Sequence, residues 1–464
     1  MLSKQKNKSQ LKPNKRRIKL LFIPFILLRS ILWITFISIL VSCNTTEPPK
    51  IEGTISLTVE DVSSTEAWLN VKTQNVTLPA ELKLFRADSV TQIINLGDTD
   101  TLLYDNELQP NKTYNFKVTI QPSNHTAIQS KTVTATTMDT TSHNFSWQTY
   151  TFGGANGSSV LNDVAIINEN NIWAVGEIHT AETDQFDSNG VWVNPYNLVH
   201  WDGQQWELKR IGSGYGNPYH TVYAFNENDV WFDGTIQWDG IRYTAHINNF
   251  PLEPNGDGWR VNAMWGTSSS DFYVVGNNGN IAHYNGSGWT KIESGTDLDI
   301  NDIWGSYNKK TGKWEILCVA SNVFSSLDRV ILSIDPLTNR VTQLSTQPIG
   351  GTLRSIWFET QSIYYAAGGG IYQKHCLSES LWKNGSHDIT TYSTNKIRAN
   401  DIIAVGGVGE VLHFNGKSWK SYFPETHLQY GNYYSAKIYN NIVVAIGDDN
   451  PTAVLIIGKR HAAT

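Results

Sequence analysis

The stretch that decides the fold lies between residues 262 and 292 and reads NAMWGTSSSDFYVVGNNGNIAHYNGSGWTKI. It contains four short apolar runs, at 262–266, 272–276, 281–284 and 289–292. The last two runs are joined by Asn285-Gly286, a strong hairpin signal because both turn positions accept positive φ. The stretch therefore predicts four short antiparallel strands in one small sheet.

The same unit recurs seven times after residue 145. Its second strand, for example Asn-Ile-Trp-Ala-Val-Gly at 171–176, centres near residues 173, 231, 273, 316, 364, 403 and 443, a mean step of 45 residues. Four-stranded propeller blades have this period. Residues 145–460 therefore predict an all-β fold, a seven-bladed β-propeller.

The seventh copy stops after its third strand. Residues 144–150 resemble the fourth strand of the other copies, yet they stand at the start of the repeat region. We expect this N-terminal strand to complete the last sheet, because a closed ring leaves no sheet edge open to aggregation.

Residues 51–138 alternate apolar and polar side chains in short runs separated by turn residues, the pattern of a β-sandwich. The segment 108–118, with Tyr114 at a strand start, resembles the tyrosine corner of fibronectin type III domains. The resemblance places Trp68 in the sandwich core. It implies a domain that spaces or binds, without chemistry, and we expect a spacer.

The first 46 residues carry nine basic and no acidic side chains, and an apolar stretch ends in Leu-Val-Ser-Cys at 40–43. This order is typical of a secretory signal, and its end resembles the bacterial lipobox. The resemblance implies a signal peptide over 1–42, a palmitate-type lipid on Cys43, and a tether over 43–50. It implies a cell-envelope protein anchored in the outer membrane by lipid, on either side of it. A membrane-spanning helix is the alternative, in which Arg29 would be costly.

The charge of the chain excludes one class of partner. The whole chain has 36 Lys+Arg against 42 Asp+Glu, and without the basic N-terminus 27 basic residues face 42 acidic ones. Nucleic-acid phosphates require Lys and Arg patches, so we expect no nucleic-acid binding. The 17 Trp, 20 Tyr and 36 Gly favour many short strands and turns over a helical enzyme.

The repeat, with its Trp-Ala-Val-Gly, His-Trp-Asp-Gly and terminal Trp elements, resembles propeller lipoproteins of Bacteroidota-type bacteria that also carry a fibronectin type III-like domain. It is distantly similar to Kelch and Asp-box propellers, although the turn at 285–289 lacks the Ser-x-Asp start of an Asp-box. The resemblance implies a fold and no activity, because propellers host hydrolases, lyases and pure binders alike.

No phosphate loop, nucleophile elbow or metalloprotease motif is present. His200, His283 and His413 recur at one strand position, which favours a structural hydrogen bond over a metal triad, because equivalent positions of different blades lie far apart. Asp163 and Asp302 align as repeat residues of the inner strands. Turn capping explains them more simply than catalysis does.

Two smaller features remain. Gln185, Asp187, Asn189 and Gly190 partly match a calcium loop, but Gln stands at its first position and Tyr at its twelfth. We therefore expect no metal and no cofactor. Cys318 and Cys376 can pair in an oxidising compartment, and two free thiols are the alternative.

The first copy differs most from the others. It inserts residues 177–197 between its second and third strands, and the connection 212–220 should emerge on the same face. Aromatic, glycine-rich loops on a rigid scaffold build binding faces, and the alternative is an insert that only covers a blade. The candidate ligand-binding residues are Phe186, Trp192, Tyr196, Tyr215, Tyr219 and His220.

Together these features predict a monomeric, membrane-anchored lipoprotein whose propeller binds a glycan or a protein without catalysis. One alternative is a carbohydrate-active enzyme, a hydrolase or transferase with a site in the propeller channel. Another is a structural or assembly lipoprotein that recognises only partner proteins.

Overall fold

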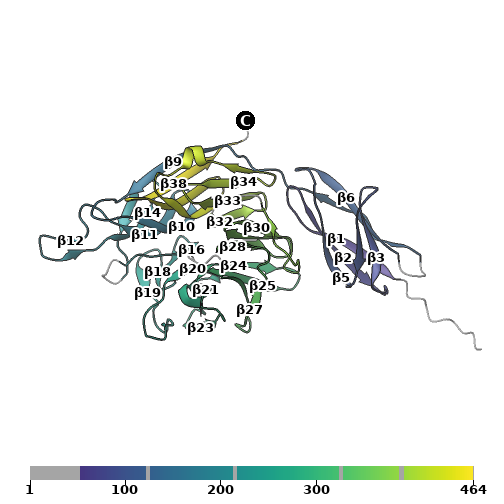
Figure 1. The fold of residues 1–464 in the computed structure, drawn as a ribbon, viewed down its shortest axis with the longest axis horizontal. Helices are drawn as coiled ribbons and strands as arrows, with labels where there is room; N and C mark the ends of the chain where they lie inside the picture. Colours follow the sequence, from purple (N-terminus) through teal and green to yellow (C-terminus); the bar gives the residue numbers. More distant parts are fainter. Residues whose placement is uncertain (1–52, 122–125, 213–216, 323–327, 386–390, 463–464) are drawn as a thin grey trace, which may run out of the picture. The chain divides into compact units, whose positions relative to one another are not determined.

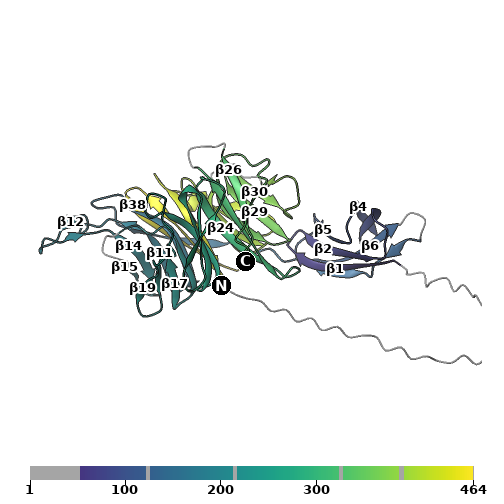
Figure 2. The same ribbon diagram turned by 90° about the horizontal axis from the view of Figure 1, so that it is seen from below.

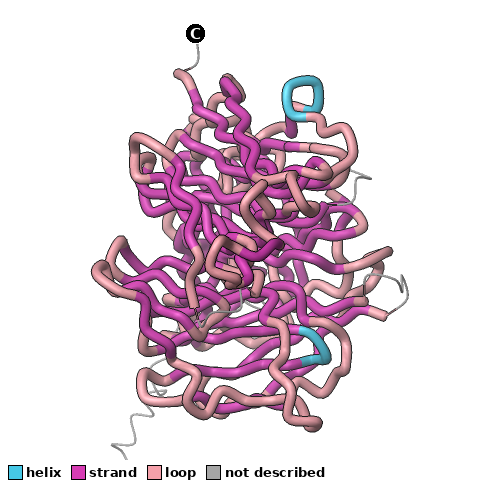
Figure 3. The backbone as a smooth tube through the Cα atoms, turned by 90° about the vertical axis from the view of Figure 1, so that its left-hand side faces the viewer, coloured by secondary structure: helices cyan, strands magenta, loops and turns pink. Residues whose placement is uncertain are grey.

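The computed structural model describes residues 53–121, 126–212, 217–322, 328–385 and 391–462. Strands predominate in these ranges (Figure 1), and the helical segments that they contain are the short η1 (Asn277–Gly279) and α2 (Phe423–Thr426), drawn in cyan in Figure 3. Within the described ranges, no helix has the length and apolar character needed to cross a membrane. The predicted signal peptide, Cys43 and tether lie outside these ranges.

Residues 54–136 form two antiparallel sheets, one ordered β1-β2-β5 and the other β4-β3-β6-β7, with β8 also paired to β6. Their strands are β1 (Thr54–Val62), β2 (Ala67–Gln74), β3 (Ala80–Arg86), β4 (Ser89–Leu96), β5 (Asp100–Asp105), β6 (Thr113–Gln121), β7 (Ile128–Gln129) and β8 (Val133–Thr136). Alternate apolar residues of both sheets, among them Leu69, Leu82 and Phe116, form one buried core.

The tyrosine contact expected from the sequence is present. Tyr114 lies at the start of β6, and its hydroxyl oxygen accepts a hydrogen bond from the Gln109 N–H at 2.8 Å. The expectation for Trp68 was wrong. Successive side chains of a strand point to opposite faces, and because Leu69 faces the sandwich core, Trp68 points away from it. Trp68 is 1% exposed and instead belongs to a buried cluster with residues of the repeat region, among them Trp357 and Ile363.

From β9 (Phe145–Phe152) onward the strands form seven four-stranded antiparallel sheets. Sheet one consists of β10 (Val160–Asn168), β11 (Asn171–Ile178), β14 (Tyr196–Trp201) and β15 (Trp206–Lys209). Sheet two consists of β16 (Val222–Asn226), β17 (Asp229–Phe232), β18 (Ile236–Trp238) and β19 (Tyr243–Ala245). Sheet three consists of β20 (Val261–Ser268), β21 (Asp271–Gly276), β22 (Asn280–Tyr284) and β23 (Trp289–Glu293). Sheets four and five consist of β24 (Ile300–Asn308), β25 (Lys313–Ser321), β26 (Arg329–Ile334) and β27 (Val341–Leu344); β28 (Leu353–Glu359), β29 (Ile363–Gly368), β30 (Gly370–Lys374) and β31 (Lys383–Asn384). Sheets six and seven consist of β32 (Thr391–Arg398), β33 (Asp401–Gly406), β34 (Val411–Phe414) and β35 (Trp419–Ser421); β36 (Asn432–Tyr439), β37 (Ile442–Asp449), β38 (Thr452–Arg460) and β9.

The seventh sheet takes its fourth strand from the beginning of the repeat region. β9 pairs with β38 along its whole length, from Phe152 opposite Ala453 to Phe145 opposite Arg460. The first strand of each sheet lies beside the first strand of the next, and β36 lies beside β10. The seven first strands therefore surround a central cavity of about 310 Å³.

A recurrent glycine lies at or near the end of the second strand in several sheets, because two strands approach closely there. The first strand carries an extra residue near its start, for example between Leu161 and Asp163, and this bulge drives its backbone toward the second strand. A Cβ on Gly176 would lie 2.0 Å from the Val160 carbonyl oxygen. Gly276, Gly368 and Gly447 would meet carbonyl oxygens at the first residue of the first strand, or one residue before it, in the same way. The glycine of the Ala-Val-Gly motif is therefore required for steric reasons.

The strand order defines two faces of the sheets. Second-to-third-strand connections and the connections between sheets emerge on one face, here called the insert face because it carries residues 179–195. The remaining connections emerge on the opposite, sandwich face. Sandwich residues contact that face: Glu66 Oε1 lies 2.7 Å from His375 Nε2, and the Tyr104 ring stacks on His375 with centroids 4.1 Å apart.

Candidate functional site

The insert of sheet one folds into a hairpin of its own. β12 (Gln185–Phe186) pairs with β13 (Trp192–Val193), and Figures 1 and 2 both show β12 extending beyond the seven sheets. The Asp187 N–H donates to the Val191 carbonyl oxygen at 2.8 Å and so closes the turn. The hairpin is therefore an ordered projection of the insert face.

The stretch that partly matches a calcium loop is the turn of this hairpin. Asp187 Oδ1 accepts hydrogen bonds from the backbone N–H groups of Asn189 and Val191, each at 2.8 Å. The bonds from Val191 and Asn189 lower the pKa of Asp187, which keeps the carboxylate charged. Gly190 has φ 76°, which suits the turn. Among the described residues no group of three or more His, Cys, Asp or Glu side chains is placed to hold a metal ion.

The tip of the hairpin exposes three large apolar side chains. Phe186 is 67% exposed, Val191 60% and Trp192 46%. The rings of Phe186 and Trp192 meet edge to face, with centroids 5.2 Å apart. Leaving such side chains in water costs free energy that burial against a partner would recover. Sequence reasoning named the two aromatic residues but missed Val191, whose only signal is its place beside the turn.

The base of the hairpin is fixed by charged and amide side chains. The guanidinium of Arg210 lies over the Tyr196 ring, 3.7 Å from its centroid, and the Arg210 Nε–H donates to the Asn194 carbonyl oxygen at 2.7 Å. The Tyr196 hydroxyl donates to Glu182, whose carboxylate lies 3.7 Å from Arg210. Tyr196 is therefore a support rather than an open contact residue, and Arg210 and Glu182 were not among the residues named from the sequence.

The structure brings the insert and the next connection together, as the topology argument expected. The Asn197 Nδ2–H group donates to the carbonyl oxygens of Ile211 and Asn217, both at 3.1 Å. The Ile211 N–H in turn donates to Asn197 Oδ1 at 2.9 Å. One buried asparagine thus joins both segments. Tyr215, the aromatic residue named in this connection, lies outside the described residues.

Tyr219 and His220 lie apart from the hairpin tip. Tyr219 is half-buried and packs against Phe232, and burial raises the pKa of its hydroxyl above the usual range. His220 lines the central cavity, and its backbone N–H donates a hydrogen bond to Asp233 Oδ1 at 2.9 Å. The five candidate residues that the structure describes therefore do not form one patch. Phe186 and Trp192 are the pair that the structure places together and leaves exposed.

The carboxylates of the central cavity bind neighbouring sheets. Asp163 Oδ1 accepts from the Ser435 hydroxyl of sheet seven at 2.7 Å, while Oδ2 accepts from the Thr221 hydroxyl and Val222 N–H of sheet two at 2.9 and 3.0 Å. Asp302 accepts in the same way from Ser355 and Ile356 of sheet five. These acceptors are occupied by structural donors.

One cavity carboxyl has a shifted proton affinity. Burial raises the pKa of Asp302 to about 6, against hydrogen bonds that lower it. A raised carboxyl pKa also occurs in general acids. Here the group is held by the Ile303 N–H, the Ser355 hydroxyl and the Ile356 N–H. The geometry is that of a staple between sheets four and five.

The repeated histidines bind the first residue of the second strand in their own sheet. His200 Nε2 lies 3.1 Å from Asn171 Oδ1, and His283 Nε2 lies 2.8 Å from Asp271 Oδ1. Gln237 fills the same position in sheet two and donates to Asp229 at 2.8 Å. Because glutamine takes the place of histidine in sheet two, this third-strand position requires a side chain that forms a hydrogen bond rather than a metal ligand.

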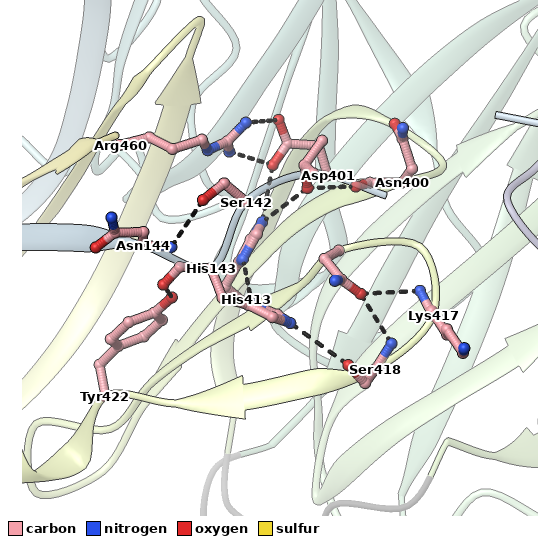
Figure 4. A network of polar contacts seen from close by, with 12 residues as sticks. Ser142, His143, Asn144, Asn400, Asp401, His413, Lys417, Ser418, Tyr422 and Arg460 are labelled. Carbon is pink, nitrogen blue, oxygen red and sulfur yellow. Dashed lines mark hydrogen bonds and ion pairs between the residues drawn. The ribbon is translucent and has the colours of Figure 1, made fainter. Parts of the chain in front are cut away.

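The third histidine belongs to a larger network at the seam of sheets six and seven (Figure 4). His413 Nε2 lies 2.9 Å from Asp401 Oδ1, and its Nδ1 lies 2.8 Å from Nδ1 of His143, just before β9. Arg460 of β38 donates to Asp401 at 2.8 Å. The network joins sheet six to both strands that complete sheet seven.

The two cysteines of the described region are free thiols. Cys318 is buried on β25, and burial raises the pKa of its thiol well above the usual range. Cys376 is half-buried on the sandwich face, with its sulfur 3.1 Å from the Ser378 hydroxyl. A buried thiol with a raised pKa is a poor nucleophile.

The seven-sheet region has the fold of a β-propeller. No protein-family model and no curated protein matches the sequence. Among solved structures, YCF48 bound to D1 peptide is similar, with 15% identity, a TM-score of 0.50, and coverage of 70% of this chain and 99% of that one. The WD40 β-propeller domain of Doa1 is similar with 13% identity, a TM-score of 0.46, and coverage of 68% and 97%. An extracellular domain of a putative one-component system from B. thetaiotaomicron is similar with 12% identity, a TM-score of 0.44, and coverage of 86% and 52%.

Proposed function

We propose that this protein is a lipid-anchored binding protein of the cell envelope, whose propeller holds a partner protein on the insert face without catalysing a reaction. The observation that carries the proposal is the β12–β13 hairpin. It exposes Phe186, Val191 and Trp192 on a base fixed by Asn197 and Arg210. Rigid aromatic anchors on a scaffold dominate the energetics of protein interfaces.

In this proposal the seven sheets are the blades of one ring over residues 145–460, closed by β9. Residues 51–138 are a fibronectin type III-like spacer, supported by the order of its two sheets and by the Tyr114 contact. The signal peptide over 1–42, the lipid on Cys43 and the tether over 43–50 rest on the lipobox resemblance alone.

A protein ligand is favoured over a glycan. YCF48, which shares the fold, was solved with a bound peptide. In this chain the exposed hairpin side chains form a convex apolar tip, which suits a groove or pocket on a partner protein. Sites for small ligands are usually concave, with a few polar groups that fix the orientation of the ligand.

The enzymatic alternative finds no support at the candidate carboxylates. Asp163 and Asp302 accept hydrogen bonds from backbone and hydroxyl groups of adjacent sheets. Replacing either aspartate should therefore destabilise the contacts between adjacent sheets rather than stop a reaction.

The test is a pull-down from envelope extracts, beside a glycan array, with the purified full chain in mild detergent. Trp192→Ala and Phe186→Ala should each weaken capture of the partner, and Trp314→Ala on the sandwich face, 37% exposed, should leave it unchanged. Capture unaffected by both insert-face changes would remove the proposed face. Turnover of any glycan that Asp302→Asn abolishes in a folded protein would overturn the binding model.

Lipid attachment has its own test. Mass spectrometry of the N-terminus purified from membranes should find an acylated cysteine at position 43 as the first residue. An unmodified Cys43 still joined to Ser42 would contradict the anchor.

A further inference from the structure

We infer that the partner segment held by the hairpin tip carries arginine or lysine side chains beside apolar ones. The inference rests on the proposed function and names the chemistry of its partner.

The charge of the two faces is unequal. The strand connections of the insert face hold eleven acidic and two Lys or Arg residues within the described ranges. The acidic residues are Glu182, Asp184, Asp187, Asp233, Glu253, Asp257, Asp297, Asp299, Asp328, Glu410 and Glu425, and the basic ones are Arg210 and Arg260. A face of this charge attracts cationic partners and repels anionic ones.

The sandwich face is balanced by the same measure. Its described connections hold six acidic residues, Glu169, Asp202, Glu227, Asp239, Asp335 and Glu379, against five basic residues, Arg242, Lys309, Lys310, Arg340 and Lys417. Among the described connections of the seven sheets, the excess of acidic residues therefore lies on the face that carries the hairpin.

The hairpin tip combines two features that a cationic side chain recognises. The rings of Phe186 and Trp192 are exposed, and the exposed carboxylate of Asp187 follows Phe186 directly. An aromatic face attracts a guanidinium or ammonium group through cation–π interaction, and a carboxylate pairs with it. A neutral sugar would use the rings but gain little from the charge.

The chain binds one of its own arginines with this chemistry. At the base of the hairpin the Arg210 guanidinium lies 3.7 Å from the Tyr196 ring centroid and 3.7 Å from the Glu182 carboxylate. The tip carries two exposed rings and an exposed carboxylate in the sequence from 186 to 192, with no arginine or lysine of its own there. A partner side chain would supply the missing cation.

The experiment uses the full chain in detergent and two pools of immobilised short peptides with the same apolar content. One pool carries Lys and Arg, the other Asp and Glu, and an array of neutral glycans forms a third arm. The variants are Trp192→Ala and Asp187→Asn. Matched controls on the sandwich face are Trp314→Ala and Asp202→Asn, since Asp202 accepts backbone N–H bonds within its own turn as Asp187 does.

We expect retention of the cationic pool alone, weakened at high ionic strength because salt screens exposed charges. Trp192→Ala should weaken binding of the cationic pool by about tenfold and Asp187→Asn by about threefold, with the controls unchanged.

Equal retention of both pools, or of neither, would overturn the inference. Glycan binding that Trp192→Ala removes would also overturn it, while the hairpin would stand as a binding face. Cationic binding insensitive to both hairpin variants would overturn the inference and the proposed face together.

Discussion

Sheets one and three share a frame and differ in one connection. Both hold a third-strand histidine against the first residue of the second strand, at 3.1 Å in sheet one and 2.8 Å in sheet three. Sheet three joins its second and third strands through η1, Asn277–Gly279. Sheet one uses residues 179–195 and places the β12–β13 hairpin there.

The comparison separates residues that hold the sheets together from residues free to meet a partner. At repeat positions, both carboxylate oxygens of Asp163 accept hydrogen bonds from adjacent sheets, and His200 Nε2 lies 3.1 Å from Asn171 Oδ1. The side chains at the hairpin tip, Phe186 and Trp192, touch each other and solvent. Function is thus expected where sheet one departs from its sister sheets.

The largest effect should come from breaking the shared frame. Asp163→Ala removes an acceptor for groups of sheets one, two and seven, and leaves their buried donors without a partner. We expect the free energy of unfolding to fall by about 3 kcal/mol or more. Asp202→Ala removes an exposed carboxylate that caps only its own turn, and it should lower the free energy of unfolding far less in the same denaturation experiment. Equal losses would show that Asp163 is no staple.

A second effect depends on pH. Burial lowers the pKa of His200 to about 4, against 6.5 in an unfolded chain, so the folded state resists protonation. Stability should therefore fall as the pH drops from 6.5 toward 4, where the unfolded state binds the extra proton. His200→Gln, which copies Gln237 of sheet two, should reduce the loss between pH 7 and pH 5 by about 1–2 kcal/mol. Denaturation at both pH values checks this, and an unchanged loss would contradict it.

A smaller effect lies in the sandwich. Tyr114→Phe deprives the Gln109 N–H of its acceptor. Because the bond is near the surface, we expect a loss of about 1 kcal/mol in the free energy of unfolding of the full chain. The control is Tyr307→Phe, whose side chain is 47% exposed. If both changes leave the denaturation curve in place, the tyrosine corner has no stabilising role.

The smallest effect on stability should come from the hairpin tip. Replacing residues 186–192 with Asn-Gly closes the hairpin at the Gln185–Val193 pair with a two-residue turn. Only exposed side chains are removed, so the free energy of unfolding should change by less than about 0.5 kcal/mol. A larger loss in the denaturation experiment would mean that the insert supports sheet one.

Much of the fold was predictable because repetition amplifies weak signals. The period of 45 residues and the recurrent Ala-Val-Gly predicted the propeller, and the glycine proves to be a steric requirement at Gly176. The face of the sheet to which a strand side chain points was harder to predict. Trp68 and Leu69 are both apolar, and only the packing of the opposite sheet decides which one faces the sandwich core.

The candidate site was less predictable, because loop sequences do not encode direction. Trp192 and Tyr219 both lie in aromatic connections, yet Trp192 is 46% exposed while Tyr219 packs against Phe232. No sequence motif indicated a role for Arg210. Its role follows from the placement of Tyr196 and Glu182 around it. Tertiary contacts, rather than residue type, decided which side chains remain available.

The most direct test of the central claim is the binding of the cationic peptide pool by the protein in which Asn-Gly replaces residues 186–192. If the hairpin tip is the contact surface, this folded variant should bind at least about tenfold more weakly than the unmodified chain, with an unchanged unfolding transition. Undiminished binding by the same folded variant would contradict the claim.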